Sequence, residues 1–67
     1  MLDLYRVHDV ARIRTGKYAG LVGAVTDTRS VDGKQTQARV KVEGVREGET
    51  VAFENWFKKS ALERNHG

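Results

Sequence analysis

Residues 8–25 read HDVARIRTGKYAGLVGAV, and their pattern predicts two short strands joined by a loop that is bounded by glycines. Apolar and charged residues alternate over residues 9–15, which is the period of a strand with one buried face. Gly16 and Gly20 bracket the loop, where we expect backbone of positive φ. Gly23 falls inside the second strand, where a side chain would obstruct the close approach of a neighbouring backbone.

This stretch resembles the KOW motif, the strand-loop-strand signature of small SH3-like barrels in ribosomal proteins and in NusG-type transcription elongation factors. Residues 16–20, GKYAG, match the family's turn of glycine, lysine or proline, an aromatic residue, any residue and glycine. Ala11 and Ile13 occupy its paired apolar positions. Gly23 and Val25 complete the pattern.

The chain departs from the motif at two positions. His8 stands where the family usually has glycine, and Ala11 stands where it usually has valine. The resemblance implies an SH3-like barrel associated with transcription or translation, whose glycine-bounded loop contacts RNA or protein.

The rest of the chain predicts three more strands, and residues 21–28 are rich in β-branched side chains. Asp-Gly at positions 32 and 33, within residues 30–34, is typical of a type I′ hairpin turn. Residues 44–48 are expected to form a loop, and residues 55–60 a turn or a single 3₁₀ turn. The further strands are expected at residues 35–43, 49–54 and 61–63.

These elements predict an all-β fold, a small five-stranded SH3-like barrel of the KOW type with a short 3₁₀ turn before the last strand. Residues 1–67 are expected to form this single domain, with residues 64–67 as a frayed tail. Trp56 or Phe57 would close one end of the core. The predicted core is Ala11, Ile13, Leu21, Val25, Ala38, Val40, Val42, Val51, Phe53 and Leu62.

Composition narrows the classes of function. A chain of 67 residues is near the lower limit for independent folding and is too small for a large catalytic cleft. It has no cysteine, so we expect the reducing cytoplasm, and no apolar run long enough for membrane insertion. Twelve Lys and Arg against nine Asp and Glu give a net charge of +3, which is compatible with a phosphate-bearing partner.

Four cations define a candidate basic face. If Ala11 and Ile13 point into the core, then Arg12 and Arg14, which alternate with them, point out. The same alternation places the cations of the strand at residues 35–43 on its outer side. The cations would contact phosphates through charge-assisted hydrogen bonds. Alternatively, they keep the barrel soluble and pair with Asp27, Glu43 and Glu54. The four are Arg12, Arg14, Arg39 and Lys41.

Lys17 and Tyr18, at the tip of the glycine-bounded loop, form a second candidate site. An exposed aromatic beside a cation could stack on a base or pack against a protein. Alternatively, Tyr18 folds back to cover the end of a small core. Both interpretations remain open.

Trp56, Phe57, Lys58 and Lys59 form a third cluster, whose composition is that of a single-strand contact surface. For Trp56 the sequence favours a place in the core, because a tryptophan buries a large area when it packs. Phe57 is left unassigned, and both lysines are candidate contacts for nucleic acid or another partner.

No residues point to a cofactor or to a metal. His8 and His66 are the two histidines, without cysteine or a carboxylate at helical spacing, and are expected on the surface or in turns.

Chain length, strand order and the ending SALER are similar to type II dihydrofolate reductases, which assemble four small barrels around a pore. Their site uses a Val-Gln-Ile-Tyr run on a late strand, and residues 50–54 of this chain read TVAFE at the corresponding place. The glutamine and the tyrosine hydroxyl are missing, so this enzyme activity is only a remote alternative.

The sequence therefore predicts a non-catalytic module that binds RNA, DNA or a nucleoprotein machine, such as a ribonucleoprotein or polymerase complex. Its contacts would be the basic outer face and the loop at residues 16–20. The alternative is a protein-interaction subunit that docks on a larger complex. A contiguous basic face would indicate nucleic acid, whereas interleaved charges with an exposed apolar patch would indicate protein docking.

Overall fold

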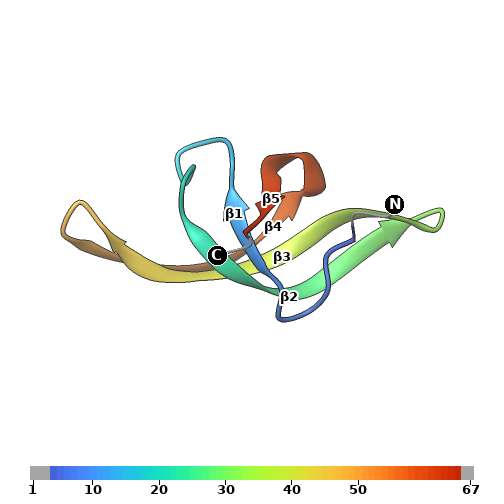
Figure 1. Ribbon diagram of the computed structural model, residues 1–67, viewed down its shortest axis with the longest axis horizontal. Coiled ribbons are helices and arrows are strands. Elements are labelled where there is room, and N and C mark those ends of the chain that lie inside the picture. Colours follow the sequence, from blue (N-terminus) through green and yellow to red (C-terminus); the bar gives the residue numbers. More distant parts are fainter. Residues whose placement is uncertain (1–3, 66–67) are drawn as a thin grey trace.

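The computed structural model describes residues 4–65 and has five antiparallel strands in one sheet, with the order β4-β3-β2-β1-β5 (Figure 1). The predicted all-β class is confirmed. Strands β4 and β5 each pair on one side only, so the hydrogen-bonded sheet does not close. The elements are β1 (Val10–Ile13), β2 (Val22–Val31), β3 (Lys34–Arg46), β4 (Glu49–Lys58), the 3₁₀ turn η1 (Lys59–Ala61) and β5 (Leu62–Arg64).

Strands β2, β3 and β4 form a long, curved ribbon, and β1, β5 and η1 lie against its middle part (Figure 1). The molecule measures 41 × 21 × 20 Å. Register shifts between β2 and β3, at Val25 to Asp27 and at Arg29 to Ser30 of β2, mark bulges in their pairing. Bulges increase the local twist of a strand, which curls the ribbon over the short strands.

The core lies inside this curl and consists of Tyr5, Ala11, Ile13, Val25, Ala38, Val40, Val42 and Leu62. All but Tyr5 were predicted, because they lie at alternate positions of strongly patterned strands. Val51 is only half-buried, at the far part of the β3–β4 hairpin. Leu21, Phe53 and Phe57 are half-buried and pack against the core from its rim.

The predicted close approach at Gly23 is present. A Cβ atom placed there would lie 2.7 Å from Val40 Cγ1 and 2.9 Å from Val42 Cγ2, and closer still to the carbonyl oxygen of Lys41. Gly16 and Gly20 have φ of 84° and 94°, as expected for the loop between β1 and β2. These three glycines therefore meet the backbone requirements that the sequence pattern indicated.

Two tight turns end the long hairpins. At the β2–β3 turn Asp32 and Gly33 have φ of 52° and 77°, the signs of the predicted type I′ turn. At the β3–β4 turn Glu47 and Gly48 have φ of 53° and 79°, so this turn has the same form. The prediction of a loop over residues 44–48 is wrong, because β3 continues to Arg46.

The predicted turn over residues 55–60 also begins too early. Strand β4 continues to Lys58 and pairs with β3 along its length, and the 3₁₀ turn occupies only Lys59–Ala61. Continuation of the strand places Trp56 opposite Arg39 on the side away from the core. Trp56 is therefore not the core plug that the sequence favoured, and Phe57 is the aromatic residue of this segment that packs against the core.

The segment before β1 is tied to the β2–β3 hairpin by one glutamine side chain. The Tyr5 N–H donates to Gln35 Oε1, and Gln35 Nε2 donates to the Tyr5 carbonyl, both at 2.8 Å. At the other end, Arg64 belongs to β5 and the Asn65 N–H donates to the Val10 carbonyl at 3.1 Å. Of the tail expected to fray, residues 66–67 lie outside the described residues.

Candidate functional site

The face of β2, β3 and β4 that points away from the core, here called the outer face, carries charges in opposed pairs. Arg39 Nε lies 3.0 Å from Glu54 Oε2, and Lys41 Nζ lies 3.3 Å from Glu43 Oε1. Thr26 Oγ1 donates to Glu54 at 2.6 Å. These cations therefore lie beside carboxylates that reduce the local positive potential.

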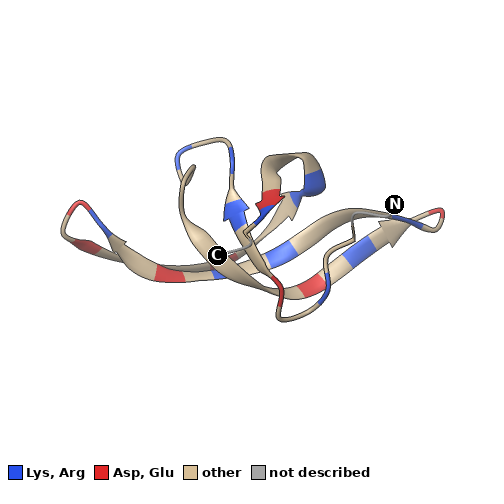
Figure 2. Ribbon diagram, viewed as in Figure 1, with Lys and Arg blue, Asp and Glu red and all other residues tan. Residues whose placement is uncertain are grey.

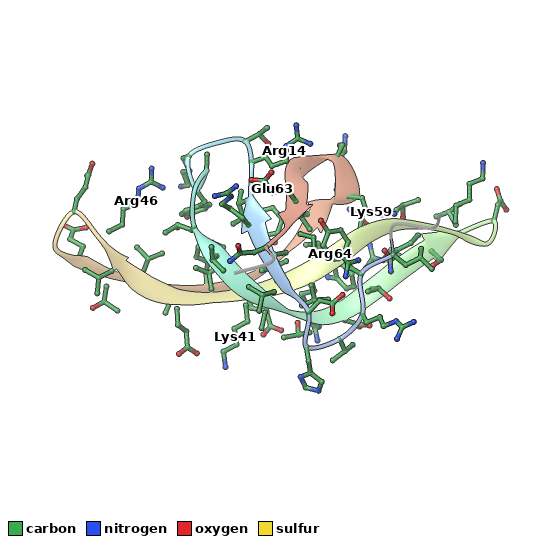
Figure 3. All side chains as sticks on the ribbon, in the orientation of Figure 1. Arg14, Lys41, Arg46, Lys59, Glu63 and Arg64 are labelled. Carbon is green, nitrogen blue, oxygen red and sulfur yellow. The ribbon has the colours of Figure 1, made fainter. Side chains whose placement is uncertain are left out.

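The four predicted basic-face cations do not form one surface. Figure 3 shows Arg14 and Lys41 on opposite sides of the ribbon of β3. Arg12, on β1, forms an ion pair with Glu63 of β5. Of the four, only Arg14 has no carboxylate partner among residues 4–65.

A second group of cations surrounds η1, and we call it the basic end: Arg14, Lys58 and Lys59. Lys58 precedes η1, Lys59 is its first residue, and the Arg14 N–H donates to the carbonyl of Ala61, its last residue, at 2.8 Å. Within the described chain none of the three pairs with a carboxylate. Figure 2 shows Lys and Arg on η1, at the end of β1 and in the following loop, whereas acidic residues mark the tip of the β3–β4 hairpin.

One carboxylate lies in this region. Figure 3 labels Glu63 near Arg14 and Lys59, on the same side of the ribbon. Its carboxylate is bound by Arg12, whose guanidinium contacts Oε1. The basic end therefore keeps an excess of positive charge.

The indole of Trp56 lies on the outer face between two arginines. The guanidinium carbon of Arg29 is 4.3 Å from a ring centroid of Trp56, and that of Arg39 is 5.7 Å away. Arg29 Nη1 also donates to Gln37 Oε1 at 3.1 Å. Stacking on an aromatic ring orients a guanidinium and leaves its second planar face available to a ligand.

An open groove lies beside this stack, between the β2–β3 hairpin and η1. Its volume is about 470 Å³, within the range of small-molecule sites. Lys58 and Gln37 are cross-strand partners and both line it, so the groove connects the basic end with the Arg29–Trp56 stack. The lining residues are Val31, Thr36, Gln37, Lys58, Lys59 and Ser60.

The glycine-bounded loop lies over the rim of the core. The ring centroids of Tyr18 and Phe53 are 4.3 Å apart, and Tyr18 is half-buried. Lys17 Nζ lies 5.0 Å from the centroid of Tyr18, and Arg46 Nη1 donates to the Lys17 carbonyl at 3.0 Å. This arrangement favours the interpretation in which Tyr18 covers the end of the core.

Arg29 and Gln37 are the residues of this region that the sequence interpretation did not nominate. The expected strand ended at residue 28 and the expected turn began at residue 30, so Arg29 was assigned to neither. A signal was nevertheless available. A two-residue turn at Asp32 and Gly33 requires pairing up to the turn, which extends the strand past Arg29. The turn alone would place Arg29 opposite Thr36, and the bulge between Arg29 and Ser30 makes Gln37 its partner.

Residues 4–65 contain no group of three His, Cys, Asp or Glu side chains that could hold a metal ion. No helix among them is long and apolar enough to span a bilayer. His8 is exposed in the turn before β1, with φ of 81°, and His66 lies outside the described residues.

Comparison of the chain with protein-family models, with curated proteins and with solved structures finds no match in any of the three. The arrangement of the chain's own residues is therefore the basis on which a function is proposed.

Proposed function

We propose that this protein is a non-catalytic module that binds nucleic acid through the basic end. The observation that carries the proposal is the distribution of ion pairs. Arg12, Arg39 and Lys41 each have a carboxylate partner, whereas the three cations around η1 have none in the described chain. Cations that are not already paired can release counterions from a phosphate backbone without first breaking an ion pair.

The proposal includes an SH3-like barrel architecture of the KOW type. Support comes from the five-stranded curled sheet, from the 3₁₀ turn between β4 and β5, and from β5 pairing with β1. The glycines add to it, because Gly16 and Gly20 have positive φ and Gly23 has no room for a side chain. In such a barrel, η1 and the end of β1 would form one end of a rigid scaffold for binding.

Two matched triple variants test the proposal. In the first, Arg14, Lys58 and Lys59 are all replaced by glutamine, and in the second the paired cations Arg12, Arg39 and Lys41 are replaced in the same way. Both variants lose three charges. Binding to labelled RNA and DNA is measured by fluorescence anisotropy over a range of salt concentrations.

We expect the first variant to lower the slope of log affinity against log salt by about two to three, and the second by less than one. Equal slopes for both variants would contradict the assignment to the basic end. A folded wild-type protein that binds neither RNA nor DNA at low salt would refute nucleic-acid binding altogether.

A second candidate function, protein docking, has its own observation. The outer-face charges are interleaved, as expected for docking, and Val10 and Val22 are exposed beside them. Pull-down with and without nuclease separates the two functions. A protein partner that is still recovered after nuclease treatment, but is not recovered with the Val22→Glu variant, would favour docking. Recovery that is lost on nuclease treatment would favour the first proposal.

A further inference from the structure

We propose that the groove between the β2–β3 hairpin and η1 holds one unpaired base of a single-stranded nucleic acid. The inference rests on the proposed function and specifies which form of nucleic acid is bound and how. It combines three features that are adjacent in the structure: an apolar wall, a stacked guanidinium and two lysines.

The groove has the chemistry that a nucleobase requires. Val31 is 55% exposed and, with the methyl group of Thr36, offers apolar surface. Gln37 Oε1 accepts from Arg29, which leaves its amide N–H groups to donate to a base edge. The Ser60 hydroxyl can donate or accept at the same wall.

The guanidinium of Arg29 is a platform at the edge of the groove. It is held from one side by Trp56, at 4.3 Å, and along its edge by Gln37, which lines the groove. Bases in single strands stack on planar guanidinium groups as well as on aromatic rings. A base next to the one in the groove would therefore stack on Arg29 without displacing Trp56.

Charge selects an anionic polymer over a neutral ligand. Lys58 and Lys59 line the groove and have no carboxylate partner within residues 4–65. They are placed to contact the phosphates on either side of an inserted base. In a duplex, a base is stacked and paired and cannot enter such a groove without being flipped out, which costs free energy.

The chain contains one tryptophan, so tryptophan fluorescence reports on the Arg29–Trp56 stack beside the groove. We expect a ten-nucleotide oligo(U) or oligo(dT) to quench Trp56 emission on binding, and a ten-base-pair duplex to bind at least about tenfold more weakly. Comparison of oligo(U) with oligo(dT) distinguishes RNA from DNA as the single strand that is bound.

A matched pair of substitutions localises the effect. Val31→Glu places a carboxylate in the groove, and Val45→Glu makes the same change at the other hairpin, where the valine is 72% exposed. We expect Val31→Glu to weaken single-strand binding about tenfold or more and Val45→Glu to change it less than about threefold. Circular dichroism and urea titration verify that both variants fold.

The outcomes separate the two proposals. Duplex binding as tight as single-strand binding, or equal effects of the two substitutions, would overturn the groove inference and leave the basic end in place. Absence of binding to every oligonucleotide by the folded wild type would overturn both.

Discussion

The two faces of the β2–β3–β4 ribbon are built on different principles. The inner face at Val25, Val40 and Val42 is dry and closely packed, and Gly23 leaves no room for another atom. The outer face at Arg39 and Trp56 is half-exposed and held by ion pairs and cation–π contacts. The inner face should therefore dominate stability, whereas the outer face and its edge at the groove remain available for binding.

Gly23→Val is the strongest test of the packing on the inner face. We expect the free energy of unfolding to fall by about 3 kcal/mol or more, because the new side chain would collide with the backbone of β3. Gly44→Val is the matched control, since no heavy atom outside Gly44 and its two chain neighbours lies within 4 Å of a Cβ placed there. Urea titration that gave equal stability for both variants would remove the argument for close packing at Gly23.

Tyr18→Ala tests where the inner face ends. Because the ring packs on Phe53, we expect a loss of about 2–3 kcal/mol in the free energy of unfolding. The affinity for oligonucleotides, measured where the variant is fully folded, should stay within about twofold of the wild type. Tyr18→Phe keeps the ring and should stay within ~1 kcal/mol of the wild type. A near-native melt with lost binding would instead move Tyr18 to the binding surface.

Glu54→Gln tests the outer face and should have the smallest effect. It removes the charge that faces Arg39 but keeps an oxygen to accept from Thr26, so we expect a loss of at most about 1 kcal/mol. The loss should shrink further in 1 M salt, which screens exposed charges. A large and salt-independent loss would show that the outer face contributes to folding as much as the inner face does.

The inner face could be predicted from the sequence because burial imposes an alternation on every strand that crosses the core. Ala38, Val40 and Val42 are recognisable from that alternation alone. Tyr5 could not be recognised in this way, because it lies outside any strand and is held by hydrogen bonds to Gln35, 30 residues away. No local pattern encodes such a contact.

The ends of the strands and the candidate site were harder to predict. The turn at Glu47 and Gly48 was missed because glutamate, unlike asparagine or aspartate, is seldom found at positive φ. That error shortened the strand expected for β3. Trp56 was assigned to the core because of its size, whereas the continuation of β4 to Lys58 places it opposite Arg39 on the outer face. Which cations are paired depends on cross-strand register, which side-chain alternation alone does not determine.

The pairing of β5 with β1 has a consequence for how fast the protein folds. Arg12 and Glu63 are partners although they are 51 positions apart, whereas the two hairpins close across two-residue turns. Hairpins form within about 1–10 μs, but joining distant strands carries the entropy of closing a long loop. We therefore expect folding on the scale of milliseconds to seconds, limited by the docking of a three-residue strand. If so, truncating Leu62 would slow folding, because its contacts form in the rate-limiting step. The ribbon that carries the groove would then take shape before the core beneath it is sealed.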